Sequence, residues 1–177
     1  MSKQLLKATH EGKITLGETD LTCAVLSNGT RVITKSAVFK AFGRTKRGRN
    51  IGEVRVPNMP AFIDANNIQP FISQELKGVL NPIDYIDKNE KVSTGYDATI
   101  LPQMCKMYLD ARQAKALKSQ QLPLARASEI LLLGLSNIGI IALVDEATGY
   151  QHEREKDELQ KILKAYISEE LLKWQKT

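Results

Sequence analysis

The chain has 177 residues, 42% of them hydrophobic and 25% charged, with a formal net charge of +5. This composition is typical of a folded globular protein and excludes a disordered chain, and two cysteines are too few for a disulfide scaffold. The positive charge is concentrated: residues 21–52 hold seven basic residues and no acidic one, while the rest of the chain holds 18 basic and 20 acidic residues. Such a segment indicates an anionic partner, most often nucleic acid.

The first third of the chain predicts β-structure followed by a short helix. Ile14 and Leu16 alternate with polar neighbours, and Asn28-Gly29 separates two apolar runs at 22–26 and 31–34, which is the pattern of a tight hairpin. Ser36 is the expected N-cap of a helix over 37–42, with Gly43 at its end. Residues 44–56 are basic, glycine-containing and poor in apolar side chains, so they predict an exposed loop.

Residues 61–96 predict short helical pieces and a second hairpin. Its strands are expected at 83–86 and 92–96, around a polar turn over 87–90. The apolar side chains before this hairpin predict a small core cluster of Phe62, Ile63, Ile68, Phe71, Ile72 and Leu76.

The second half predicts helices. They are expected from Asp97 or Thr99 to about 117, from 123 to 147, with Gly149 as the stop, and from 151 to 167. The stretch 130–144 is apolar on nearly all sides, so we expect it to be the buried centre of a helical layer and too short to span a bilayer. Small residues would allow a neighbouring helix to approach it closely, namely Gly134, Gly139 and Ala142.

The last predicted helix carries one apolar stripe at helical spacing, formed by Leu159, Ile162, Leu163, Tyr166 and Ile167. Two interpretations stay open, packing against the body of the protein or the seam of a homodimer. The predicted fold class is α+β, with N-terminal β-hairpins and short helices and a C-terminal α-helical layer around a central apolar helix. We expect a β-rich module over 1–96 and a helical module over 97–177 that share one core.

Several short runs along the chain resemble the phage-associated P-sixty-three-C domain family. They are His10-Glu11-Gly12, Cys23-Ala24-Val25-Leu26, Gly29-Thr30-Arg31-Val32, Ala41-Phe42-Gly43-Arg44, Gly95-Tyr96-Asp97-Ala98 and the stretch from Ala142 to Gln151. The resemblance implies an origin in phage, prophage or other mobile elements, and a likeness to antirepressor-type proteins whose β-rich N-terminal parts bind DNA. Similar proteins continue beyond the Trp174 region with an aromatic-rich segment, and this chain stops at Thr177.

The basic segment supplies the candidate nucleic-acid contacts, because arginine forks and lysines suit phosphate oxygens. A docking surface for an acidic protein and a merely solvated loop are the other interpretations. Gly43 and Gly48 have the spacing of a phosphate-binding loop, but Arg49 and Asn50 replace its lysine and hydroxyl residue, so a nucleotide site is not predicted. The candidate residues are Arg31, Lys35, Lys40, Arg44, Lys46, Arg47 and Arg49.

Catalytic and metal-binding patterns are weak. The two histidines, His10 and His152, do not lie at ligand spacing from a cysteine or from each other, so no metal and no cofactor is expected. We expect the two cysteines to be buried, reduced thiols, although one disulfide between them stays open. A polar cluster near the end of the central helix predicts a structural role, with one carboxylate paired to Arg154 or Arg126, and acid–base catalysis is the alternative. Its members are Asp145, Glu146, Tyr150, Gln151 and Arg154.

The sequence therefore predicts a non-catalytic regulatory protein of phage or prophage type that binds nucleic acid, with DNA as the expected partner. The alternative is a protein-interaction module, a phage effector or inhibitor that docks on a host protein, with a homodimer as an open possibility. Residues 1–13 contain no apolar signal-peptide core, so a cytoplasmic location away from the membrane is expected.

Overall fold

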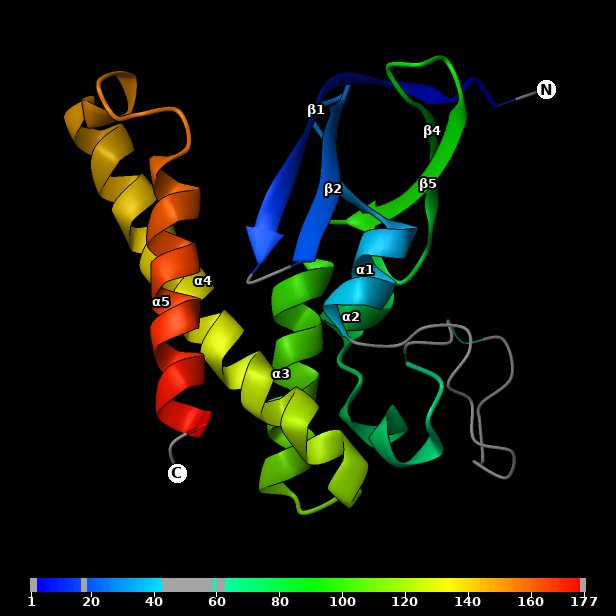
Figure 1. Ribbon diagram of the computed structural model, residues 1–177. Coiled ribbons are helices and arrows are strands. Elements are labelled where there is room, and N and C mark those ends of the chain that lie inside the picture. The colour runs from blue at the N-terminus through cyan, green and yellow to red at the C-terminus, as the bar shows by residue number, and fades with distance from the viewer. Residues whose placement is uncertain (1–2, 17–18, 43–58, 60–62, 176–177) are drawn as a thin grey trace.

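The computed structural model describes residues 3–16, 19–42, 59 and 63–175, and its fold is α+β (Figure 1). The strands of the N-terminal half are β1 (Leu6–Leu16), β2 (Thr19–Leu26), β3 (Arg31–Thr34), β4 (Ile83–Ile86) and β5 (Val92–Asp97). The α-helices are α1 (Lys35–Ala41), α2 (Gln74–Val79), α3 (Ile100–Gln113), α4 (Leu122–Thr148) and α5 (Glu158–Gln175). Short 3-10 turns are η1 (Asn66–Phe71), η2 (Ser119–Gln121) and η3 (Tyr150–His152).

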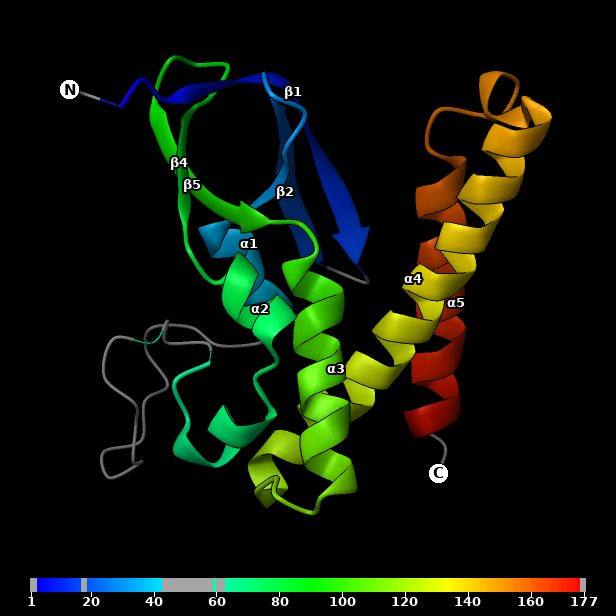
Figure 2. The same ribbon diagram turned by 180° about the vertical axis from the view of Figure 1, so that it is seen from behind.

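The strands close into a small barrel in the order β1-β2-β3-β5-β4 (Figure 2). Neighbours are antiparallel except at the closing seam, where β1 runs parallel to β4 and Leu6 is opposite Tyr85. Both predicted hairpins are confirmed, and Gly29 takes the left-handed φ of +86° that the first turn requires. The N-terminal half of β1 was not predicted, because its side chains are mostly exposed and its pairing comes from β2 and β4 rather than from local pattern.

Helix α1 begins two residues before the sequence expectation. Its N-cap is Thr34, not Ser36: the Thr34 hydroxyl accepts a hydrogen bond from the backbone N–H of Ala37, at 3.3 Å. Ser36 instead lies within the first turn of the helix. The predicted helix end at Gly43, the predicted loop over 44–56 and Phe62 of the predicted cluster lie outside the described residues.

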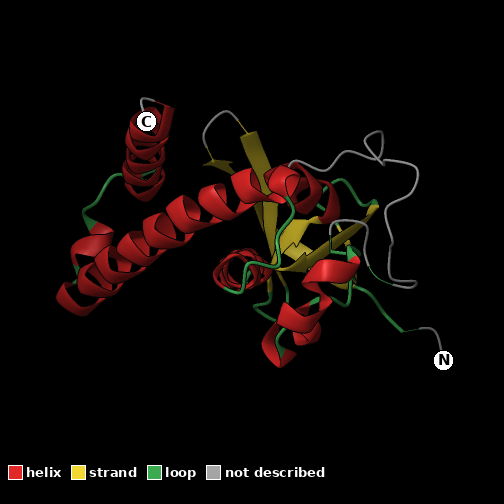
Figure 3. Ribbon diagram, turned by 90° about the horizontal axis from the view of Figure 1, so that it is seen from below, coloured by secondary structure: helices red, strands yellow, loops and turns green. Residues whose placement is uncertain are grey.

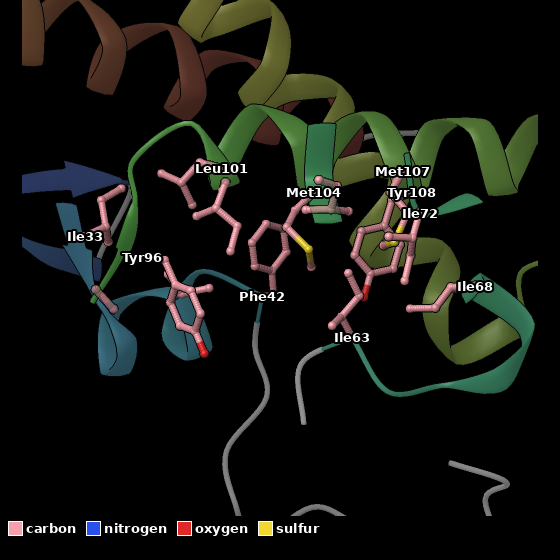
Figure 4. Packing of buried hydrophobic residues seen from close by; sticks show 14 of the residues in the cluster. Ile33, Phe42, Ile63, Ile68, Ile72, Tyr96, Leu101, Met104, Met107 and Tyr108 are labelled. Atoms are coloured by element: carbon pink, nitrogen blue, oxygen red, sulfur yellow. The ribbon is translucent and has the colours of Figure 1, made fainter. Parts of the chain in front are cut away.

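The main core joins the barrel to α3 (Figure 4). Helix α3 buries a face that includes Leu101, Met104 and Tyr108, and the Tyr108 ring stacks on Phe42 with centroids 6.1 Å apart. Of the cluster predicted over 61–80, Ile63, Ile68, Ile72 and Leu76 are buried here and Phe71 packs at the edge. One hydrophobic core therefore contains side chains from both halves of the chain.

The predicted helix over 123–147 is confirmed to within one residue at each end: α4 has 27 residues, and it ends where Gly149 takes a φ of +81°. It leaves the barrel side of the molecule and extends outward to meet α5 (Figure 3). The prediction that 130–144 forms a buried centre is wrong: in this stretch the structure buries Ile130 and Gly134 and leaves most other side chains half-buried or exposed. Composition shows how apolar the helix is, but its neighbours α3 and α5 and Leu16 of β1 cover only part of its surface.

The segment Ser119–Thr148, which contains α4, is long and apolar enough by length and composition to cross a membrane. Only 17% of its most apolar 18-residue window is buried within the described part of the molecule. The sequence expectation had considered the 15-residue run alone, and the helix extends beyond that run at both ends.

The last helix starts later and runs further than predicted. Residues 150–157 form η3 and an irregular connection, and α5 then continues through Leu171 and Leu172 as one helix to Gln175. The connection reverses the chain so that α5 packs against α4. Its stripe is largely used in this packing, because Leu163 and Ile167 are buried against Ile130. Gly134 lets α5 approach as predicted, since an added Cβ would lie 3.0 Å from Leu163, whereas Gly139 faces open space.

Candidate nucleic-acid interface

Three of the seven candidate basic residues lie in the described part of the chain, at the junction of β3 and α1. Arg31 is the first residue of β3, Lys35 is the first residue of α1, and Lys40 lies in the last turn of α1. All three side chains are exposed, while Val32, Ile33, Ala37 and Val38 between them are buried and anchor the backbone. From the rise of a strand and of a helix, the three Cα positions extend over at most about 20 Å, a little over half a turn of duplex DNA.

These three cations are electrostatically uncompensated within the described ranges. No carboxylate there forms an ion pair with Arg31, Lys35 or Lys40. The same holds for exposed lysines elsewhere, such as Lys77, Lys88 and Lys156, while Lys106, Arg112, Arg126, Arg154, Lys161 and Lys173 are paired. Cations without an acidic partner retain a positive electrostatic potential that attracts an anion. We call these three residues the basic strip.

The other four candidates, Arg44, Lys46, Arg47 and Arg49, lie outside the described residues. Phe42, the residue at which the description of this segment stops, is buried beside Tyr108. Their contribution to an interface stays a prediction from the sequence.

A surface pocket lies beside Arg31 at one end of the basic strip and another beside Lys40 at the other end. Arg31 lines a depression of about 320 Å³ on the barrel wall, together with His10, Glu11 and Cys23. The Glu11 carboxylate accepts a hydrogen bond of 2.8 Å from the backbone N–H of Lys88. Cys23 is a half-buried free thiol whose pKa is raised by burial, so it is a poor nucleophile at neutral pH.

Lys40 lines a larger groove of about 920 Å³ between the barrel rim, α4 and α5. Its walls are mostly apolar, with Leu16, Ile130 and Leu171 among them, and Lys164 of α5 supplies a second cation. Sequence analysis missed Lys164, because no local signal relates a lysine near the end of the chain to α1. Only the packing of α5 beside β1 brings them to one groove.

The predicted polar cluster does not form one site. Arg154 donates a hydrogen bond of 2.7 Å to Asp145, and both side chains are largely buried, so this pair is one of the two that the sequence suggested. Arg126 instead pairs with Glu129. Glu146 and Tyr150 are exposed, and Gln151 lies beside His152 at 3.4 Å. Adjacent helical residues point about 100° apart, which separates the two carboxylates.

Within the described residues, no group of three or more histidine, cysteine, aspartate or glutamate side chains could hold a metal ion. Cys105 is a buried free thiol on α3, and its burial raises its pKa to about 12. It therefore stays protonated and unreactive in the folded protein.

Comparisons of the chain with models of known protein families, with curated proteins and with solved structures find no match.

Proposed function

We propose that the protein is a phage- or prophage-type regulatory protein that binds nucleic acid, with double-stranded DNA as its partner, through its basic segment. The observation that carries this proposal is the basic strip: Arg31, Lys35 and Lys40 are exposed, lie along one junction of strand and helix and form no ion pair within the described structure. Arg44, Lys46, Arg47 and Arg49, which follow directly in the sequence, extend the same positive charge.

The proposed contacts are with phosphates. Lysine and arginine side chains on a rigid junction of strand and helix would hold the protein on the duplex backbone, and such contacts give affinity and orientation but little sequence preference. Hydrogen bonds from the Arg31 guanidinium and the two ammonium groups go to phosphate oxygens, and no bond is made or broken. The protein acts by occupying DNA, and we place this activity in the cytoplasm.

The test is the salt dependence of binding. We expect the wild-type protein to bind labelled duplex DNA at 50 mM salt and to lose affinity steeply by 200 mM, since each phosphate contact contributes a slope of about −0.9 in log K against log salt. The triple variant R31Q/K35Q/K40Q should bind more weakly and reduce the slope by about 3, and K46A/R47A/R49A should do the same if the second part of the segment also contacts DNA.

The matched control is K77A/K88A/K156A, which removes the same charge from three exposed lysines elsewhere. This variant should retain at least most of the wild-type affinity and slope. Equal losses in R31Q/K35Q/K40Q and the control would show that only net charge matters, and an absence of wild-type binding at 50 mM salt would refute the proposal.

A further inference from the structure

The outer half of α4 exposes large apolar side chains. Leu133, Ile140, Leu143 and Val144 have 54%, 58%, 63% and 52% of their surfaces exposed. All four lie on α4, which extends away from the barrel (Figure 3). At about 100° per residue their directions fall within an arc of roughly 100°, so they form one elongated surface.

Of the four large side chains, Leu133 and Ile140 are seven residues apart, and Leu143 and Val144 lie to either side of the row that they form. Leu133, Ile140 and Ala147 form one row, and Leu143 with Ser136 and Val144 with Asn137 form the rows beside it. A seven-residue repeat keeps one seam of a helix facing another helix along its whole length. We call this surface the α4 seam.

The α4 seam is not the side that α5 covers. Gly134 lies against Leu163 of α5, and at about 100° per residue Leu133 and Ile140 point roughly 100–120° away from it. Asn137 and Val144 continue the seven-residue row of Ile130, which packs on Leu163, so they form the edge of the seam beside α5. The sequence suggested the apolar stripe of α5 as a dimer seam, but this stripe packs largely against α4 of the same chain. The α4 seam stays exposed.

We propose that the protein is a dimer in which the α4 seams of two copies cover each other. The two α4–α5 hairpins then form a four-helix bundle around a twofold axis. A twofold interface must be complementary to itself. The seam meets this condition, because residues 130–144 carry no charge and the acidic groups at either end, Glu129 and Asp145, are neutralised by arginines of their own chain.

The area agrees with a dimer. The four large side chains expose on the order of 400 Å² per copy, and with Ser136, Asn137 and Ala147 complete coverage in a pair of copies would bury about 1,200 Å², the lower end of the range of specific interfaces. The Ser136 hydroxyl already donates to the carbonyl of Leu132 at 2.9 Å, so it needs no partner across the seam.

A lipid bilayer fits the same helix less well. The charge-free run between Glu129 and Asp145 has 15 residues, which at 1.5 Å per residue gives about 22 Å, shorter than the roughly 30 Å of the hydrocarbon core. Asn137 is exposed halfway along this run, where a bilayer would leave its amide without partners, while the edge of a helix pair accommodates an asparagine.

The first experiment is sedimentation equilibrium of the full chain at micromolar concentration. We expect a mass of twice 19.7 kDa for the wild type and 19.7 kDa for I140E. The control is V92E: Val92 is a 65% exposed apolar residue of β5, away from α4, and its substitution should leave the dimer intact. Circular dichroism should show that both variants are folded, since neither side chain is in the core.

The second experiment is disulfide trapping of I140C in a C23S background. Ile140 lies midway between Leu133 and Ala147, so a twofold axis at the centre of the seam brings it to its own copy whether the two α4 helices run parallel or antiparallel. Mild oxidation should crosslink I140C, while I162C, on the exposed part of α5, should stay monomeric. L133C should crosslink only in the parallel arrangement.

A monomeric wild type, or a dimer that survives I140E, would overturn the proposal. So would a wild type that floats with phosphatidylcholine–phosphatidylglycerol vesicles through the same residues, or one that stays monomeric and covers the seam with a host protein. The inference does not rest on DNA binding, because the basic strip and the α4 seam lie on different elements and each variant tests one of them.

Discussion

At the scale of single residues, the ion pair between Asp145 and Arg154 decides how α4 connects to α5. Asp145 lies in the last turns of α4, and Arg154 comes from the irregular connection that follows η3. Only 11% and 20% of the two side chains are exposed, so each charge depends on the other for its compensation. The pair therefore fixes the point at which the chain reverses.

Removing one partner of the Asp145–Arg154 pair should lower the free energy of unfolding more than removing both partners. We expect Arg154→Met to lower the free energy of unfolding by about 2–3 kcal/mol, because it leaves a mostly buried carboxylate unpaired, and we expect Asp145→Leu in the same chain to restore part of that loss. Urea unfolding of the two single variants and the double variant measures the coupling.

Lys161→Met is the control for this cycle. Its pairs with Glu155 and Asp157 are solvent-exposed, so the change should cost less than about 1 kcal/mol. Additive effects of R154M and D145L would contradict the role given to the buried pair.

At the scale of elements, three glycines of α4 and its end have different physical roles. Gly149 ends the helix with a φ of +81°, which side chains rarely adopt. Gly134 lies against α5, whereas an added Cβ at Gly139 would meet nothing within 4 Å. Substitution by alanine should therefore raise the stability of the protein at one of these glycines and lower it at another.

We expect Gly139→Ala to stabilise the protein by up to about 1 kcal/mol through helix propensity, and Gly149→Ala to destabilise it by about 1 kcal/mol. Gly134→Ala should gain less than Gly139→Ala, because its Cβ would press on Leu163 and Tyr166 at 3.0 Å. Thermal melting of the three variants gives the order, and a loss of stability in G139A would show that this position is covered, contrary to the described structure.

The elements also show where sequence reasoning works. Turn chemistry predicted both hairpins, and Gly149 correctly ended α4, because these signals are local. The burial of 130–144 and the start of α5 were wrong, because they depend on which surfaces meet after folding. For the candidate site, sequence placed Arg31, Lys35 and Lys40 in one segment, but it could not reveal Lys164, the hollows or the open seam.

At the scale of the whole molecule, the pairing of β3 with β5 joins two segments that are far apart in the sequence. Gly95 of β5 lies opposite Thr34, and a Cβ there would be only 2.7 Å from the carbonyl oxygen of Ile33. Backbone cannot yield as a flexible side chain does, so glycine is required for the two strands to meet.

Gly95→Ala should therefore destabilise the entire domain, by at least about 2 kcal/mol, since barrel and α3 share one core. Gly12→Ala, in β1 with open space around it, should change stability by less than about 1 kcal/mol. Chemical unfolding followed by circular dichroism compares the two, and a G95A protein as stable as G12A would contradict the close approach of β3 and β5.

The pairing of β1 with β4 also delays the closure of the barrel while the chain is being synthesised. Strands β1, β2 and β3 can pair as soon as they leave the ribosome, but their outer edges find β4 and β5 only after roughly 60 further residues have been made. At 5–20 residues per second, that interval is about 3–13 s. Throughout it the nascent chain presents a three-stranded sheet with both edges unpaired, the form in which strands most readily join those of neighbouring chains.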